Sequence, residues 1–315
     1  MAEILIMGEL LVEIMRPKED IPLCETDSFR GPFPSGAPGI FISTAARLGH
    51  SAAIISGVGK DDFGETILNR LRKDGVDVSR VLISEQGNTG VAFVTYFADG
   101  ERKFLFYMDG SPCVMAKAPE DLSGLEDVRY MHIMGCSLMS SAVFAEEIVK
   151  TMHRMKQLGA RISFDPNVRL EMMRDPSVLQ TLREVAANAS ILMPGKEELK
   201  MLTGEEDIDR AAEKAFQSPA LEVLVLKNGS KGSAIYTRDG LAFEQGIYRV
   251  IQADATGAGD SYDAAFICAL AEGKALREAA RMGAAAGALH AAAFGPLEGK
   301  ISRETVAELL RSQEQ

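Results

Sequence analysis

The chain has 315 residues, 46% hydrophobic and 25% charged, and 45 acidic against 34 basic residues give it a net charge of −11. This composition predicts a large buried core, and the acidity argues against nucleic-acid and anionic-membrane partners, since both need a basic surface. Its four cysteines are scattered, the N-terminal segment lacks the basic residues of a signal peptide, and residues 282–294 are too short to span a bilayer. We therefore expect a cytoplasmic protein with reduced thiols.

Short apolar segments recur along the chain, mostly bounded by Gly, Pro, Asp or Asn, which is typical of fully buried strands. These segments are residues 4–7, 52–56, 130–134, 161–164, 190–193 and 223–226. Helical periods lie between them, as in 63–73, where Asp62 is the expected N-cap, and in 140–158, which Gly159 is expected to end. Strands that alternate with helices predict an αβα domain with a mainly parallel sheet.

Two segments depart from this alternation. Residues 12–34 are rich in proline and charge and have no helical period, whereas residues 88–111 alternate apolar and polar side chains on either side of Asp99-Gly100, a strong hairpin signal. We expect them to form a small β lid inserted into one αβα domain. The expected boundaries are 1–11, 35–87 and 112–315 for the αβα domain and 12–34 and 88–111 for the lid.

The segment ADATGAGDSY, residues 253–262, combines a glycine-rich turn with a carboxylate. It is neither a P-loop nor a dinucleotide fingerprint, because no Gly-Lys is followed by Ser or Thr and Tyr262 stands where the fingerprint needs glycine. Residues 257–259 lie at an expected helix N-terminus, where free amides stabilise anions and where glycine permits positive φ. Phosphoryl transfer needs both such a cradle and a base, although the motif alone also fits an ordinary capped helix.

The segment DATGAGDSYDAAF resembles the C-terminal signature of the ribokinase-like, or PfkB, carbohydrate kinases, D-T-x-G-A-G-D-x-[FY]. Further blocks resemble family motifs in the family's order: GELLVEI (8–14), SGAPGIFISTAARLG (35–49), GVGKDDFG (57–64), SFDPNVR (163–169), PGKEEL (194–199) and LKNGSKGS (226–233). The resemblance implies a ribokinase-like three-layer αβα sandwich with a mainly parallel central sheet and a small inserted β lid. It also implies an ATP- and Mg²⁺-dependent kinase that phosphorylates a primary hydroxyl of a small sugar.

The resemblance assigns the catalytic and nucleotide-binding roles. Asp260 is the expected base for the sugar hydroxyl, and the preceding amides, those of Gly257, Ala258 and Gly259, are the expected anion hole. The residues expected beside the nucleotide are Lys227, Gly229, Gly232, Gly257 and Gly259.

The metal-binding roles also follow from the resemblance. Glu198 matches the glutamate of an N-x-x-E motif and is expected to act on Mg²⁺ through water, although Gly195 replaces the asparagine. Asp254 and Thr256 match a position where relatives often bind a monovalent cation, so K⁺ is a further candidate cofactor.

The sugar-binding signature departs most from the family. The residues expected to bind the sugar are Glu13, Ser35, Gly36, Ile40, Tyr107, Asn167, Arg169 and Asp260. Ser35 and Ile40 replace the usual glycine and asparagine, and Glu13 replaces the usual aspartate, so the hydroxyl pattern that is recognised must differ.

One further position bears on the choice of sugar. Met108 stands where the similar 2-keto-3-deoxygluconate kinases carry an arginine for the substrate's carboxylate, which favours a neutral ketohexose such as fructose or tagatose. A 2-keto-3-deoxygluconate kinase is the alternative, since Arg102 or Arg169 could hold a carboxylate.

Two other classes compete with a kinase. A non-catalytic sugar-binding protein on a kinase fold is suggested by the family departures and disfavoured by the intact Asp260 loop, and a nicotinamide dehydrogenase lacks its fingerprint. As for partners, we expect no nucleic acid and no membrane. The lid strands within 88–107 are expected to pair in a homodimer, because unpaired strand edges seek partners.

Overall fold

The computed structural model describes residues 2–98, 100–173, 175 and 177–313. Within them, the largest element is a nine-stranded sheet in the order β13-β12-β11-β10-β9-β8-β1-β4-β5. Its strands are β1 (Ile4–Met7), β4 (Ala52–Gly59), β5 (Val81–Ser84), β8 (Tyr130–Met134), β9 (Arg161–Asp165), β10 (Ile191–Leu192), β11 (Val223–Lys227), β12 (Ser233–Thr237) and β13 (Gly240–Gln245). All neighbouring strands from β5 to β11 pair in parallel, and only β11-β12 and β12-β13 are antiparallel.

The strands are apolar throughout because both faces of this sheet are covered. In β1, Ile4 and Ile6 join the core on one face, while Leu5 and Met7 join the core on the other. Successive side chains of a strand point to opposite faces, so a strand between two helix layers needs apolar residues at every position. The continuous apolar runs of the sequence are therefore central strands.

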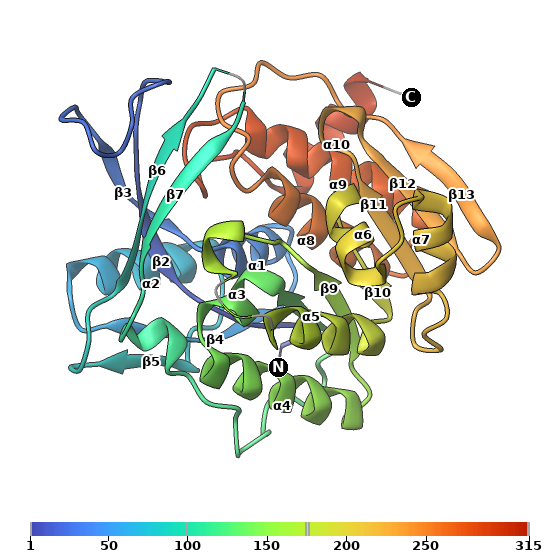
Figure 1. Cartoon of the computed structure of the whole chain (residues 1–315), viewed down its shortest axis with the longest axis horizontal. Helices are drawn as coiled ribbons and strands as arrows, with labels where there is room; N and C mark the ends of the chain where they lie inside the picture. The colour runs from blue at the N-terminus through green and yellow to red at the C-terminus, as the bar shows by residue number, and fades with distance from the viewer. Residues whose placement is uncertain (1, 99, 174, 176, 314–315) are drawn as a thin grey trace.

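Helices cover both faces of the sheet, as Figure 1 shows. One layer consists of α1 (Ala37–Arg47), α2 (Asp62–Asp74), α8 (Ala258–Ala271), α9 (Leu276–Ala291) and α10 (Arg303–Ser312). The other layer consists of α3 (Gly135–Ser140), α4 (Ala142–Gln157), α5 (Ser177–Asn188), α6 (Lys196–Thr203) and α7 (Ile208–Ala215). The short 3₁₀ segments are η1 (Pro112–Val114), η2 (Leu170–Met172) and η3 (Gly229–Lys231). The expected αβα sandwich with a mainly parallel sheet is confirmed.

A second, four-stranded sheet rises beside this body, at the left of Figure 1; we call it the lid sheet. Its order is β3-β2-β6-β7, formed by β2 (Leu11–Met15), β3 (Arg30–Ser35), β6 (Gly90–Tyr96) and β7 (Arg102–Tyr107). β6 and β7 pair antiparallel from Val91–Tyr107 to Tyr96–Arg102, which confirms the predicted hairpin. Of the turn predicted at Asp99-Gly100, Asp99 lies outside the described residues.

Two local predictions were wrong. The helix expected over 140–158 begins only at Ala142, as α4, because Ser141 is extended and its hydroxyl caps α4 by accepting from the amide of Phe144. The N-cap of α2 is Asp61 instead of Asp62, since Asp61 is the extended residue and its Oδ1 accepts from the amide of Gly64 at 2.8 Å. No helix in the described part of the chain has both the length and the apolar character needed to cross a membrane.

Candidate active site

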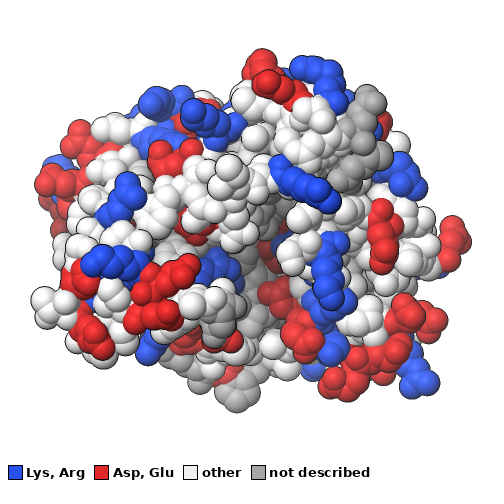
Figure 2. Space-filling model, turned by 90° about the horizontal axis from the view of Figure 1, so that it is seen from above, with Lys and Arg blue, Asp and Glu red and all other residues white. Residues whose placement is uncertain are grey.

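Two neighbouring cavities lie where the carboxyl ends of the parallel strands meet the lid sheet. The inner cavity, of about 290 Å³, reaches from Glu9 and Asp165, at the ends of strands, to Asp260 on α8. The outer cavity, of about 640 Å³, lies between the β11–β12 turn and helices α8 and α9. Both are lined by Arg102, Lys227, Gly229, Ala255 and Gly259. Seen from above in Figure 2, the molecule is hollowed near its centre, and basic and acidic side chains are interspersed around the hollow.

The N-terminus of α8 lies where the two cavities meet. Gly257 is its N-cap with φ +85°, and Ala258 and Gly259 form its first turn. A Cβ on Gly257 would lie within 3 Å of Ile40 and His290, so this position needs glycine for space as well as for its backbone conformation. Gly259 is helical, contrary to the positive φ considered for it. The amide of Ala258 donates to the carbonyl of Ala255 at 3.2 Å, and a helix N-terminus of this kind is suited to stabilise an anion.

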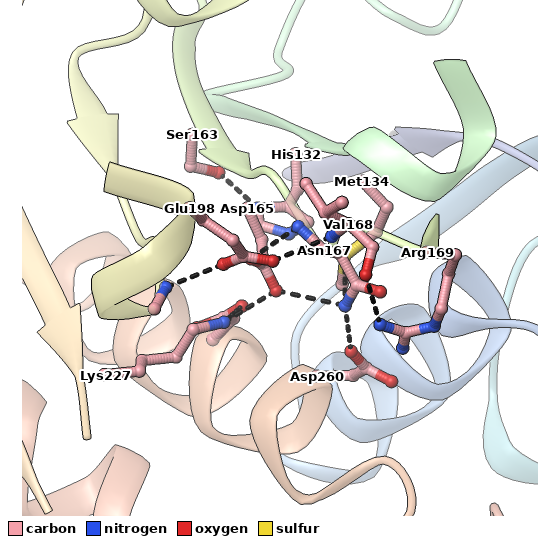
Figure 3. Close-up of polar contacts among 12 residues, drawn as sticks. His132, Met134, Ser163, Asp165, Asn167, Val168, Arg169, Glu198, Lys227 and Asp260 are labelled. Carbon is pink, nitrogen blue, oxygen red and sulfur yellow. Dashed lines mark hydrogen bonds and ion pairs between the residues drawn. The ribbon is translucent and has the colours of Figure 1, made fainter. Parts of the chain in front are cut away.

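Asp260 is buried beside this turn and faces the inner cavity. Its Oδ1 accepts a hydrogen bond of 3.0 Å from Nδ2 of Asn167, as Figure 3 shows. Burial and the nearby charge of Asp165 raise the pKa of Asp260 to about 6. A carboxylate that titrates near neutral pH is suited to accept a proton during a reaction.

Lys227 connects two further buried carboxyl groups. Its ammonium donates to Oδ2 of Asp165 at 2.6 Å and to Oδ2 of Asp263 at 2.9 Å. Burial raises the pKa of both carboxyl groups. For Asp165, the charge of Lys227 outweighs burial and brings its pKa below the usual range. For Asp263, burial and the nearby Asp165 keep its pKa well above that range. Lys227 thus bridges two buried carboxyl groups and places a positive charge beside Gly259.

Glu198 lies at the start of α6 and lines the inner cavity. It accepts hydrogen bonds of 2.7 Å from the amides of Val168 and Gly195, and burial together with Asp165 raises its pKa. No group of three or more His, Cys, Asp or Glu in the described ranges is arranged to hold a metal ion. A Mg²⁺ ion bound here would therefore take most of its ligands from phosphate and water, as Mg²⁺ commonly does, which fits an indirect role for Glu198.

The opposite wall of the inner cavity carries the residues expected to bind a sugar. Ser35 donates to Oε1 of Glu13 at 2.6 Å, and Oε2 of Glu13 has no partner among the described residues. Burial and the nearby Asp254 raise the pKa of Glu13 to about 7. Gly36, the N-cap of α1 with φ +99°, and the buried Ile40 complete this wall. Glu13 therefore has one buried oxygen without a partner in the described part of the chain.

Arg169 and Tyr107 were both expected to bind the sugar, but only Arg169 lines the inner cavity. Arg169 lines the inner cavity, and its guanidinium donates to the carbonyl of Val168 at 3.2 Å and lies 5.8 Å from the centre of the Phe104 ring. Tyr107 does not line the cavity: it is 60% exposed and packs edge-on against Phe93. Side chains alternate along β7, so Phe104 and Phe106 face the cavity and Tyr107 faces away.

The pair considered for a monovalent cation connects the lid sheet to the loop before α8. The Tyr96 hydroxyl donates to Oδ2 of Asp254 at 3.2 Å and lies 3.1 Å from Oγ1 of Thr256. Arg102 also donates to Oγ1 of Thr256 at 3.1 Å, and Oδ1 of Asp254 accepts from the Thr256 amide at 2.9 Å. Both side chains thus have partners within the protein.

The remaining expected residues line the outer cavity. Gly229 and Gly232 have φ values of +53° and +90°, and a Cβ on Gly232 would lie 2.0 Å from the carbonyl of Gln245. Glycine at 232 therefore lets β12 and the chain after β13 approach closely beside the cavity.

Sequence reasoning missed part of the inner cavity. The residues not expected there are Glu9, Leu11, Ala37, Phe104, Phe106, Cys136 and Met172. Glu9 is buried and accepts from Sγ of Cys136 at 3.2 Å and from the hydroxyl of Ser137. It follows directly on the first buried strand, and a charged residue at the carboxyl end of a parallel strand was the signal that could have identified it.

Comparison with known proteins agrees with this geometry. Residues 3–301 match the profile described as pfkB family carbohydrate kinase. The chain is 31% identical to probable fructokinase-7 of Arabidopsis thaliana over 97% of its length and 91% of the relative's. The crystal structure of a putative ribokinase II of E. coli in complex with ATP and Mg²⁺ is 34% identical, covers 99% of this chain and 100% of that one, and gives a TM-score of 0.92. A fructokinase of Xylella fastidiosa with bound ATP, 22% identical over 100% of both chains, has the same fold with a TM-score of 0.87.

Proposed function

Because the chain belongs to the pfkB family of carbohydrate kinases, we propose that it transfers the γ-phosphoryl group of ATP to a primary hydroxyl of a ketohexose, fructose or tagatose. The observation that carries this proposal is the position of the α8 N-terminus. Its amides lie where the inner and outer cavities meet, and Asp260 faces the inner one. A sugar in the inner cavity and a nucleotide in the outer cavity would therefore meet at an anion site and a base.

In the proposed reaction, the sugar hydroxyl attacks the γ-phosphorus, the bond to the β-phosphate oxygen breaks, and ADP leaves. Asp260 accepts the hydroxyl proton, and its bond to Asn167 fixes the direction of its carboxylate. The amides of residues 257–259 and the Lys227 ammonium stabilise the charge on the transferring group, because preorganised donors need no rearrangement during the reaction. Mg²⁺, when bound with ATP, neutralises phosphate charge, and Glu198 would hold one of its water ligands.

The outer cavity is suited to bind a nucleotide. Its size is within the usual range for small-molecule sites, and the side of its wall that α9 forms has only small residues, such as Gly287 and Ala288. The E. coli relative, which shares more than a third of its residues with this chain, was crystallised with ATP and Mg²⁺.

A neutral sugar suits the inner cavity better than an acid. Glu9 and Glu13 line it and burial raises the pKa of both, so a substrate carboxylate in this cavity would lie beside two further carboxyl groups. Met108 lines neither the inner nor the outer cavity. A 2-keto-3-deoxygluconate kinase is the second candidate function, favoured by Arg102 and Arg169 in the inner cavity.

A substrate screen tests the proposal. The protein, ATP and Mg²⁺ are incubated with fructose, tagatose, ribose or 2-keto-3-deoxygluconate, ADP release is followed by a coupled assay, and the product is identified by ³¹P NMR. We expect a ketohexose to give the highest kcat/KM. The second candidate is correct if the acid does. If no sugar raises ADP release although calorimetry shows sugar binding, the protein is a sugar-binding protein without kinase activity.

The remaining features of the proposal concern assembly and location. We propose a homodimer through the lid sheet, whose edge strand β7 exposes Leu105 and Tyr107, in a cytoplasmic protein with no nucleic-acid partner. The lid is proposed to be residues 12–34 and 88–111, on a domain formed by 1–11, 35–87 and 112–315. Sedimentation equilibrium tests the dimer. Turnover in KCl compared with tetramethylammonium chloride tests the K⁺ requirement proposed for Asp254 and Thr256.

A further inference from the structure

A buried histidine lies directly behind the anion site, and the proposed reaction has so far given it no role. His290, on α9, is 1% exposed. Its ring packs against the N-cap of α8 so closely that a Cβ on Gly257 would lie 2.7 Å from Nε2. Together with Ile40, this ring closes the space behind the turn whose amides face the cavities. His290 is thus the polar side chain in contact with the back of the anion site.

The other ring nitrogen is held by a hydrogen-bonded chain of hydroxyls. Nδ1 lies 2.7 Å from Oγ of Ser261, and this oxygen lies 3.1 Å from Oγ1 of Thr44. All three side chains are buried, and the chain joins helices α9, α8 and α1. Ser261 is the residue after Asp260, so the network is connected to the base and to the anion site through the first turn of α8.

The direction of the hydrogen bond between Ser261 and Nδ1 determines which ring nitrogen carries the proton. Nε2 makes no hydrogen bond of ordinary geometry within the described residues, and the nearby backbone of Thr256 favours the protonated ring. Burial lowers the pKa of His290 to about 4, so the ring is neutral and carries a single proton at neutral pH. If the Ser261 hydroxyl donates to Nδ1, that proton is on Nε2 and points toward the loop.

We propose that His290 is a positioning residue for phosphoryl transfer: its Nε2–H supports the backbone at Thr256 and Gly257 from behind and thereby fixes the amides of residues 257–259 that face the phosphoryl group. The proposal rests on the function proposed above. Gly257 has no side chain and a positive φ, so its own conformational preferences do not hold the turn in place. An anion site acts through donors that are fixed in advance, so its support from behind affects the transition state more than substrate binding.

Two substitutions distinguish support by the Nε2–H donor of His290 from the simple packing of its ring. His290→Leu fills similar space without a donor, and we expect kcat to fall about 10- to 100-fold while the KM values for ATP and sugar change little. His290→Gln can place an amide N–H near the Nε2 position, and we expect it to recover most of kcat. The matched control is His50→Leu, another buried histidine, which pairs with Glu3 and Glu272 far from the site. It should lower the melting temperature and leave kcat per folded enzyme unchanged.

A double-mutant cycle tests the hydroxyl chain. Ser261→Ala removes the donor to Nδ1 and should lower kcat less than His290→Leu does. Because Ser261 acts through His290, the double variant should be no slower than His290→Leu alone. Additive losses in the double variant, or equal kcat in His290→Leu and wild type, would overturn the proposal. If His290→Leu does not fold, the other two variants test the proposal. A kcat near that of wild type in His290→Gln and a lower kcat in Ser261→Ala support it. A low kcat in His290→Gln and an unchanged kcat in Ser261→Ala refute it.

A binding measurement keeps this inference separate from the proposed function. ADP with aluminium fluoride mimics the transferring phosphoryl group, whereas ADP alone does not. His290→Leu should lose about tenfold in affinity for ADP–aluminium fluoride, by calorimetry, and bind ADP as wild type does. Equal affinities of wild type and variant would refute the support role even if no sugar is phosphorylated. A wild type that phosphorylates no sugar refutes the proposed function alone.

Discussion

Asn167 donates a hydrogen bond of 3.0 Å to Asp260 from a position 93 residues earlier in the chain. Asn167 has φ +40°, a left-handed conformation that its own contacts hold: its amide donates to Oδ1 of Asp165 and its Nδ2 to Oδ2 of the same residue. The bond occupies Oδ1 of Asp260 and leaves Oδ2 for the hydroxyl proton. The proposed base is thus oriented by a strained residue of the segment after β9, and such strain is common at functional sites.

Replacing the base should abolish most of the activity. We expect Asp260→Asn to lower kcat by about 10²–10⁴-fold, since an amide cannot accept the hydroxyl proton. Because burial raises the pKa of Asp260, its charged form destabilises the folded protein at pH values above that pKa. We therefore expect Asp260→Asn to melt at a higher temperature than wild type at pH 8. Asp62→Asn, at an exposed position, is the control. Near-normal turnover by folded Asp260→Asn would show that another group is the base.

The effect of the Asn167 side chain on kcat and the effect of its backbone conformation on stability can be measured separately. Asn167→Gly removes the hydrogen bond and adopts φ +40° without strain, so we expect kcat to fall about 10- to 100-fold. Asn167→Ala should lose as much kcat and also about 1–2 kcal/mol of unfolding free energy relative to Asn167→Gly, because alanine is strained in this conformation. Steady-state kinetics and urea unfolding measure the two effects. Equal kcat in wild type and Asn167→Gly would exclude an orienting role.

The activity should fall in mild acid. The raised pKa of Asp260, about 6, means that the base is protonated below that pH. We therefore expect kcat/KM to be constant above about pH 7 and to fall roughly tenfold for each pH unit below the pKa. Rates are measured between pH 5 and 9 on protein shown by circular dichroism to be folded. A profile that stays flat down to pH 5 would contradict the assignment of Asp260 as the base.

Removing the buried ammonium should destabilise the fold. Lys227→Met leaves Asp165 and Asp263 without their shared cation, and we expect a loss of about 3–5 kcal/mol in the free energy of unfolding. Lys60→Met, which breaks an exposed pair with Glu85, should cost at most about 1 kcal/mol.

The difference in unfolding free energy between wild type and Lys227→Met should become smaller as the pH falls. Lys227 lowers the pKa of Asp165 in the folded wild type, so the stabilisation is present above the unfolded pKa of an aspartate and is lost as pH falls through the folded value. The gap between wild type and Lys227→Met should therefore narrow in acid. Urea unfolding at pH 7 and at about pH 2.5 measures it, and a gap that widens at the lower pH would contradict the ion-pair account.

Binding of the sugar should depend on Glu13. Oε2 of this residue has no partner among the described residues, and the side chain lines the inner cavity. We expect Glu13→Gln to raise the KM for the sugar about 10- to 100-fold, the loss of a hydrogen bond to a charged group, with little change in the KM for ATP. Glu19→Gln, at an exposed position of the same segment, is the control. An unchanged sugar KM would place the sugar elsewhere in the cavity.

Local chemistry made much of this protein predictable from its sequence. Apolar runs with alternating helical periods indicated the αβα layers, since a strand buried on both faces must be apolar throughout. The glycines before Asp260 indicated a tight turn and the proposed anion site, and only a residue without Cβ fits at Gly257. Tyr107 does not line the inner cavity, and the alternation of side chains along β7 already indicated that it lies on the face opposite Phe104 and Phe106.

The sequence by itself therefore determined the layers, the lid hairpin and the glycine-rich loop before Asp260, because these depend on side-chain period and backbone conformation. Only the tertiary structure decided which distant side chains meet that loop: Asn167 on Asp260, Lys227 between Asp165 and Asp263, and His290 behind Gly257. The physical reason is that a pKa or a tautomer is set by burial and by charges within a few ångströms. Those neighbours come from separate strands and helices, and their proximity is created by packing the layers together.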